Sequence, residues 1–133
     1  MSRVQLALNV PNIDEAVDFY AAMFATEPHK RRPGYANFEV ADPPLKLVLF
    51  ENAQAAERLN HLGVEVASPD DVVASTDRFT SAGLDVRLQT AELCCHAVQD
   101  KVWTDAPDGE WEFYTILDDE PAGVVGSEST CCS

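Results

Sequence analysis

The sequence predicts an α+β fold in which one β-α-β-β-β module occurs twice in tandem. The first observation behind this prediction is an internal repeat, because residues 4–10 (VQLALNV) align with residues 60–66 (NHLGVEV). Both segments alternate with a period of two, which is typical of a strand with one buried face. The second observation is that each copy is followed by a helix signal and then by further strand-like segments.

The predicted elements follow one another in the same order in both halves. In the first half, Asn12 caps a helix that begins with two acidic residues and ends near Pro28. In the second half, Ser68 and Pro69 begin a helix that ends at Gly83. The expected strands cover residues 35–39 and 45–51, with a less defined third piece, in the first half, and residues 86–90, 97–104 and 110–117 in the second. The sequence APDG between the last two strands is typical of a tight turn.

The length of 133 residues, 46% of them hydrophobic, supports one compact domain with its own core. We expect this single domain to span residues 1–118, with module one at about 3–51 and module two at about 59–117. Residues 52–58 connect the two modules. Residues 119–133 are rich in glycine, serine and acids and lack periodicity, so we expect a flexible C-terminal tail.

The charge balance excludes several partner classes. The formal net charge is −14, from 23 acidic and 9 basic residues, so phosphate backbones and anionic membranes would repel the chain. Neither a run of 18 apolar residues nor a secretory signal is present, and we therefore expect a cytoplasmic protein. We also expect it to be a monomer or a homodimer. In that reducing compartment its cysteines are expected to be thiols.

Three polar residues are candidate metal ligands. The repeat places Gln5 and His61 at equivalent strand positions, and Glu112 shares a face of the last strand with Tyr114. A buried carboxylate needs a partner or a metal. Together the three offer an imidazole nitrogen, a carboxylate oxygen and an amide oxygen, a set that leaves coordination positions open and suits iron(II), manganese or nickel. Taken alone, an inward histidine is more often a hydrogen-bonded core residue, and it is the repeat that favours a ligand.

All four cysteines lie in two vicinal pairs, Cys94-Cys95 and Cys131-Cys132. Neighbouring thiols form a strained disulfide that closes no useful loop, but they chelate a soft ion such as trivalent arsenic or cadmium. Plain packing is the alternative for such a pair. The second pair has no place in either module, and we expect the tail that carries it to be dispensable.

Several other residues have two interpretations. His96 and Lys101 are placed to lower the pKa of a cysteine thiol or to contact a bound substrate, although a surface role is the simpler expectation for both. Tyr114 either lines a pocket or fills the core. The basic stretch 29–32 (HKRR) is expected to form a solvated loop.

The order of elements and the segments RVQLALNV, LNHLGVEV and CCHAVQDKVWTDAPDGEWEFYT resemble a known group of proteins. The two modules resemble the vicinal oxygen chelate superfamily of glyoxalases, bleomycin-resistance proteins and extradiol dioxygenases. The segments resemble its carbon-arsenic lyase group, whose relatives are often called cadmium-induced proteins. The resemblance covers residues 3–117 and implies that the two modules form a barrel-shaped sheet.

This resemblance implies a function and a ligand set. Gln5, His61 and Glu112 would bind non-haem Fe(II), and Cys94 and Cys95 would bind the arsenic of a small trivalent organoarsenical. The implied reaction is dioxygen-dependent cleavage of the carbon-arsenic bond of methylarsenite or reduced aromatic arsenicals, which releases arsenite. Two alternatives remain: a non-catalytic thiol protein that binds cadmium or arsenite, and an enzyme of the glyoxalase or extradiol dioxygenase type. Against the second, the first-half counterparts of Glu112, around residues 47–49, are apolar.

Overall fold

The computed structural model describes residues 2–94 and 96–121. Within these ranges the order of elements is β-α-β-β-β twice over, which confirms the predicted α+β fold of two tandem modules. The elements are β1 (Arg3–Val10), α1 (Ile13–Phe24), β2 (Lys30–Arg32), β3 (Tyr35–Val40), β4 (Leu45–Glu51), β5 (Leu59–Glu65), α2 (Pro69–Ser81), β6 (Val86–Cys94), β7 (Ala97–Ala106) and β8 (Gly109–Asp118).

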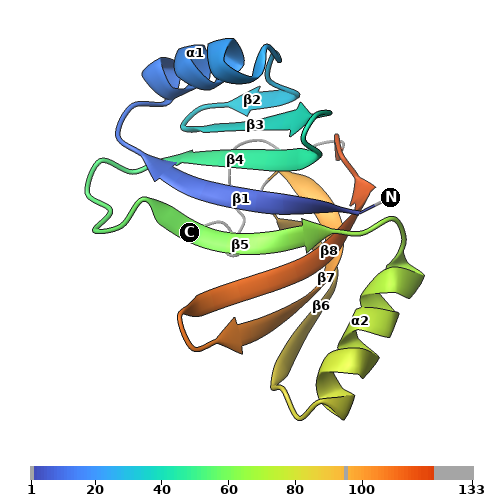
Figure 1. Ribbon diagram of the computed structural model, residues 1–133. Coiled ribbons are helices and arrows are strands. Elements are labelled where there is room, and N and C mark those ends of the chain that lie inside the picture. Colours follow the sequence, from blue (N-terminus) through green and yellow to red (C-terminus); the bar gives the residue numbers. More distant parts are fainter. Residues whose placement is uncertain (1, 95, 122–133) are drawn as a thin grey trace. The chain divides into compact units, whose positions relative to one another are not determined.

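The chain divides into two compact units, and the division falls inside β5, between Gly63 and Val64. The first unit, Arg3–Gly63, orders its strands β2-β3-β4-β1-β5. Helix α1 covers one face of this sheet (Figure 1). That face holds the core of the unit, which comprises Leu8, Val10, Ile13, Val17, Ala36, Phe38, Val40, Leu47 and Leu49. We call the opposite face, which carries Gln5 and its neighbours, the inner face of the first unit.

The inner face follows from strand register. Strands β1 and β4 run parallel with Gln5 beside Lys46, and β3 and β4 run antiparallel with Glu39 beside Lys46. Because residues paired across a sheet share a face, these three side chains form one row. A second row pairs Asn37 with Val48 on one side and with Lys30 on the other.

Both helices begin as predicted but end earlier than predicted. The Asn12 side chain accepts a hydrogen bond from the Glu15 amide at 3.0 Å, and the Ser68 hydroxyl caps α2 in the same way. Helix α1 ends at Phe24 because Ala25 adopts a left-handed conformation with φ 50°, which closes the helix before Pro28 is reached.

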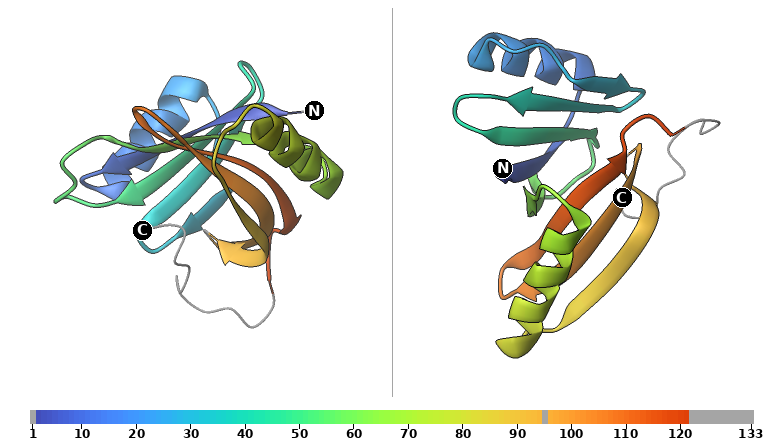
Figure 2. Two further views of the ribbon diagram at one scale, coloured as in Figure 1. Left: turned by 90° about the horizontal axis from the view of Figure 1, so that it is seen from below. Right: turned by 90° about the vertical axis from the view of Figure 1, so that its right-hand side faces the viewer.

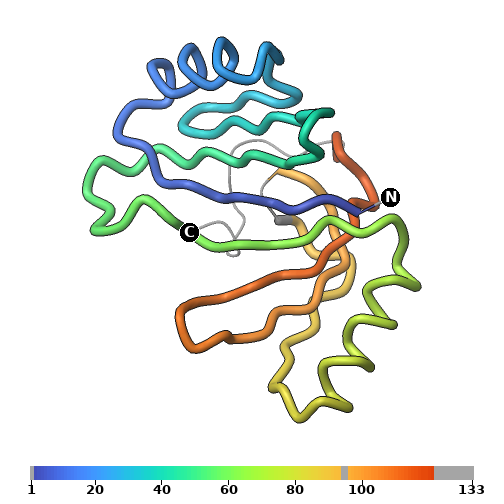
Figure 3. The backbone as a smooth tube through the Cα atoms, in the orientation of Figure 1, coloured from blue at the N-terminus to red at the C-terminus, as the bar shows by residue number. Residues whose placement is uncertain are grey.

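The second unit holds the remaining described residues, with the antiparallel strand order β8-β7-β6. Helix α2 packs along one face of these strands (Figure 2), through a cluster of Val72, Phe79 and Val102. The β6–β7 hairpin can be followed in the tube of Figure 3. Its last paired residues are Cys94 and Ala97.

The prediction of a solvated loop at residues 29–32 is wrong. Residues 30–32 form β2, and the Lys30 side chain is only 3% exposed. The reason is the pairing of Lys30 with Asn37, which places Lys30 on the inner face. Neither helix described is long and apolar enough to cross a membrane.

Candidate functional site

Gln5 and His61, the two residues that the repeat made equivalent, meet on the inner face of the first unit. The Gln5 Nε2 amide donates to His61 Nε2 at 3.1 Å, and each residue is 5% exposed. The contact between Gln5 and His61 links β1 to β5, the first strand of the second module. Two of the three predicted ligands are thus adjacent and buried, and their side chains point at each other.

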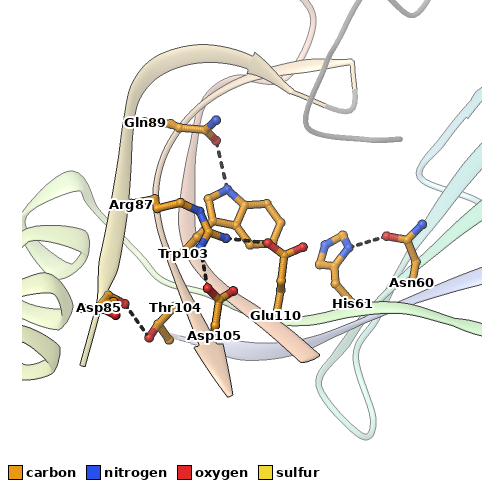
Figure 4. Close-up of polar contacts among 9 residues, drawn as sticks. All are labelled: Asn60, His61, Asp85, Arg87, Gln89, Trp103, Thr104, Asp105 and Glu110. Carbon is orange, nitrogen blue, oxygen red and sulfur yellow. Dashed lines mark hydrogen bonds and ion pairs between the residues drawn. The ribbon is translucent and has the colours of Figure 1, made fainter. Parts of the chain in front are cut away.

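A hydrogen bond at Nδ1, the second ring nitrogen of His61, orients the imidazole. His61 Nδ1 lies 2.8 Å from Asn60 Oδ1, so Nδ1 carries the proton and Nε2 carries the lone pair (Figure 4). Asn60 is itself fixed, because its Nδ2 donates to Asn9 Oδ1 at 3.0 Å, and Asn9 donates to the Glu57 carbonyl at 3.1 Å. Metal-binding histidines are oriented by this kind of contact, in which the second ring N–H donates to a fixed oxygen.

A charged row continues the inner face beyond Gln5. Lys46 Nζ lies 3.3 Å from Glu39 Oε2. Burial by itself would raise the pKa of the Glu39 carboxyl, but the positive charges around it hold that pKa below the ordinary value of 4.5. In decreasing order of effect these charges are Lys46, Arg3 and His29. Gln5 is therefore beside a lysine whose charge is shared with a carboxylate.

The third predicted ligand, Glu112, lies in the second unit and is paired with a lysine. Lys101 Nζ donates to Glu112 Oε1 at 2.5 Å, with Lys101 1% exposed and Glu112 3% exposed. The simpler expectation of a surface role for Lys101 is therefore wrong. The cause is register: β7 and β8 pair Lys101 with Tyr114 and Trp103 with Glu112, so all four share the face away from α2.

Aromatic rings enclose the ammonium group of Lys101. Its Nζ lies 5.3 Å from the centroid of the Trp103 ring and 5.6 Å from that of Tyr114. The Trp103 indole N–H donates to Gln89 Oε1 at 3.0 Å, which fixes the ring (Figure 4). Tyr114 is 2% exposed and thus forms part of this buried cage.

Cys94 is the last residue of β6, at the tip of the β6–β7 hairpin. Cys95 lies outside the described residues, and His96, which follows it, has a φ of 70°. Strand β6 contains a bulge before the tip: the register shifts between Gln89 and Glu92, and Ala91 has a φ of 50° with its amide donating to Asp100 Oδ1 at 2.7 Å. A bulge reverses the alternation of every later residue in its strand, so it sets the register of the tip.

Two further observations concern metal binding and the tail. Among residues 2–94 and 96–121, no group of three or more His, Cys, Asp or Glu side chains that could hold a metal ion is found. The predicted set contains only two such residues, because its third member is a glutamine. The second thiol pair, Cys131-Cys132, lies outside the described residues.

Sequence reasoning missed Asn60 and Glu39. The alternation of β5 marks His61 as inward but says nothing of the partner of its second nitrogen. The link from Asn60 to Asn9 depends on which strands are neighbours, and no local pattern carries that information.

Comparison with known proteins identifies the family. The profile of the Glyoxalase/Bleomycin resistance protein/Dioxygenase superfamily matches residues 3–124. The chain belongs to this superfamily. The superfamily resemblance drawn from the two modules is therefore confirmed, and the order of strands and helices described above is that of its fold.

Two relatives narrow the group within the superfamily. The cadmium-induced protein CadI of Mycobacterium tuberculosis is 57% identical over 142 aligned positions, which cover 99% of this chain and 93% of that protein. The trivalent organoarsenical cleaving enzyme of Thermomonospora curvata is 48% identical over 135 positions, which cover 100% of this chain and 89% of that protein.

Solved structures of the superfamily share the fold at low identity. The Mn(II)-bound glyoxalase from Novosphingobium aromaticivorans matches with a TM-score of 0.63 and 20% identity, over 94% of this chain and 44% of that chain. Homoprotocatechuate 2,3-dioxygenase from Arthrobacter globiformis matches with a TM-score of 0.63 and 15% identity, over 86% of this chain and 35% of that chain. Both likenesses concern the fold alone.

Proposed function

We propose that this protein cleaves the carbon-arsenic bond of trivalent organoarsenicals such as methylarsenite or reduced aromatic arsenicals, with non-haem Fe(II) as cofactor and dioxygen as co-substrate, and releases arsenite. The observation that carries the proposal is the buried His61–Gln5 contact, with the His61 ring oriented from behind by Asn60. Its support from relatives is the 48% identity to a trivalent organoarsenical cleaving enzyme.

The donor set fits a divalent iron ion. His61 Nε2 is unprotonated, because its Nδ1–H is committed to Asn60, and its lone pair accepts from the Gln5 amide N–H. A half-turn of the Gln5 amide group would bring Oε1 beside this lone pair, and both atoms would then face a metal ion. We propose Glu112 as the third ligand. Iron(II) held by these three residues would keep coordination positions open and would supply the activation of dioxygen.

Lys101 has a definite part in this scheme. A carboxylate as buried as that of Glu112 needs a cation or hydrogen-bond donors beside it. Lys101 Nζ provides both, at 2.5 Å from Glu112 Oε1. We therefore propose Lys101 as a positioning residue that holds the Glu112 carboxylate in place as a ligand.

In this proposal the vicinal thiols bind the arsenic, and the oxygen and nitrogen donors bind the iron. Cys94 and Cys95 bind the arsenic as thiolates and release their protons on binding. A soft dithiol suits arsenic, whereas the harder donors suit iron. The thiols thereby hold the arsenical.

The proposal is tested with a double variant and a matched control. Cys94→Ser with Cys95→Ser should abolish arsenite release from methylarsenite by the iron-loaded protein in air. Cys131→Ser with Cys132→Ser makes the same chemical change at the other vicinal pair and should leave the rate within about twofold. A parent rate in the first variant contradicts the proposal.

Dioxygen and iron are tested separately. The iron-loaded parent protein should release no arsenite under anaerobic conditions, and admission of air should start the reaction. Turnover at the full rate with iron chelated and dioxygen excluded would contradict the proposed chemistry.

A second candidate function is retention of cadmium or arsenite by the thiols without conversion, and the 57% identity to a protein named cadmium-induced favours it. The two candidates differ in product. Stoichiometric retention of the metalloid, with no product formed in air and added iron(II), would support the binding protein.

A further inference from the structure

An aromatic wall leads away from His61 along the inner face of the first unit. The Phe50 ring lies 6.5 Å from the His61 ring, and the Tyr35 ring lies 5.6 Å from the Phe50 ring. All three rings belong to residues 3–63 and come from neighbouring strands β5, β4 and β3. A flat apolar group next to His61 would therefore meet aromatic surfaces along its length.

At its far end the aromatic wall meets the polar side chain of Asn37. Asn37 Nδ2 donates to the Tyr35 hydroxyl at 2.9 Å, and Asn37 is 3% exposed. Its Oδ1 is buried and accepts no hydrogen bond from residues 2–94 or 96–121. Buried acceptors without a donor are rare in folded proteins because the loss of their hydration is not compensated.

The position of Asn37 in the sheet indicates where a donor for its Oδ1 could come from. Asn37 pairs with Val48 on one side and with Lys30 on the other, so it lies one strand beyond β4 on the face that carries Gln5. A leucine has the same branched arrangement of side-chain heavy atoms as asparagine and would leave no acceptor unmatched. An asparagine at this position is explained if a donor from a ligand reaches Oδ1.

We propose that Asn37, with Phe50 and Tyr35, forms a subsite for the organic group of the substrate, and that this subsite selects aryl arsenicals that carry a hydrogen-bond donor, such as a hydroxyl group, opposite the arsenic. The inference rests on the proposed function, because it takes the arsenical to react beside His61. The ring lies along Phe50 and Tyr35, and its substituent donates to Asn37 Oδ1. A methyl group is too short to reach this point.

Three trivalent substrates separate the contributions. Phenylarsenite has the ring alone, 4-hydroxyphenylarsenite adds a donor, and 4-methoxyphenylarsenite adds an oxygen that accepts but cannot donate. The iron-loaded parent protein should favour the hydroxyl compound about tenfold over the other two in kcat/KM, the size expected for one buried hydrogen bond. The same ratio should appear in dissociation constants measured without dioxygen.

Two variants at one position complete the test. Asn37→Leu should bring the three substrates within about twofold of one another, both in kcat/KM and in the dissociation constants measured without dioxygen. Asn37→Asp keeps an acceptor and should keep the preference. An equal ratio in the parent protein, or a preference that survives in Asn37→Leu, overturns the subsite.

Failure of the proposed function gives a different result. In that case the parent protein releases arsenite from none of the three compounds. The anaerobic dissociation constants still decide the subsite, because a preference for the hydroxyl compound that disappears in Asn37→Leu supports it without any turnover, and equal constants overturn it.

Discussion

Each unit of this protein pairs a buried lysine with a glutamate, and the two pairs differ in how exposed the glutamate is to solvent. In the first unit, Lys46 is 3% exposed, but the Glu39 side chain is 35% exposed and also contacts Arg3 and His29. In the second unit, the side chains of Lys101 and Glu112 are 1% and 4% exposed.

The difference in exposure predicts how strongly each carboxylate depends on its lysine. When a carboxylate is open to solvent and contacts several cations, removal of one cation changes the free energy of unfolding only slightly. A carboxylate that is fully buried with one cation depends on it strongly, because an uncompensated buried charge is costly. We therefore interpret Glu39 as structural and Glu112 as a group held ready for an incoming cation.

The largest expected effect is the loss of stability in Lys101→Met. The substitution leaves Glu112 buried without its cation and should lower the free energy of unfolding of the metal-free protein by about 3–5 kcal/mol. Addition of Mn(II) or anaerobic Fe(II) should restore part of this stability, since a ligand that binds only the folded state stabilises it. Urea unfolding with and without metal measures both effects.

Lys46→Met is the matched control for this substitution. Glu39 keeps Arg3 and remains accessible to water, so the loss should be about 1 kcal/mol or less, with no recovery on metal addition. Equal losses in the two lysine variants would contradict the distinction between the pairs.

The second expected effect concerns turnover. Glu112→Gln should lower arsenite release by about 100-fold, which corresponds to about 2.7 kcal/mol of activation free energy. Glu39→Gln should stay within about twofold of the parent rate. The measurement is the rate of arsenite release at saturating iron(II) in air.

A double variant separates the ligand role of Glu112 from its role in folding. Lys101→Met with Glu112→Gln removes both buried charges, and replacement of a buried pair by neutral groups is often close to neutral for stability. Its free energy of unfolding should recover toward the parent value while turnover stays lost. If turnover recovers together with stability, Glu112 does not act as a ligand.

The third expected effect is on metal affinity in the first unit. Asn60→Leu removes the oxygen that accepts from His61 Nδ1, and the ring loses its fixed tautomer and orientation. Metal affinity should fall by about 10- to 100-fold, as is usual when such an orienting partner is removed. Anaerobic titration with Mn(II) or Fe(II) measures the loss.

Asn52→Leu is the control for this variant, because Asn52 is exposed and its side-chain oxygen accepts from the Gln54 amide at 3.1 Å rather than from a histidine. Its metal affinity should equal that of the parent. An Asn60→Leu variant with unchanged affinity would show that His61 needs no support from Asn60.

These residues also show what the sequence allows and where it stops. Period-two alternation is a property of a single strand, so it marked Gln5, His61 and Glu112 as inward, and all three are buried. The order of elements followed from the repeat and from helix caps, which are local signals as well.

What could not be predicted depends on pairing between strands. Lys101 reaches Glu112 because β7 and β8 pair in one register, and an offset of a single residue would turn Lys101 toward the other face. The bulge before Cys94 depends on a left-handed alanine, Ala91, which no residue preference marks. The prediction for Lys30 was wrong because a run of basic residues usually lies in a solvent-exposed loop, whereas here the run forms a three-residue strand that buries Lys30.

The smallest expected effect is a pH dependence at Glu39. The positive charges beside it hold its pKa in the folded state below the ordinary value of 4.5, whereas the unfolded chain has the ordinary value. The group therefore stabilises the fold above pH 4.5, and this contribution disappears as the pH falls through the lower pKa of the folded state. Because the side chain is partly exposed, screening by water limits the contribution to below about 1 kcal/mol. The free energies of unfolding of the parent and Glu39→Gln should thus differ at pH 7 and converge once the pH falls below the folded-state pKa of Glu39, whereas a difference that grows toward acid would give the pKa shift of Glu39 the opposite sign.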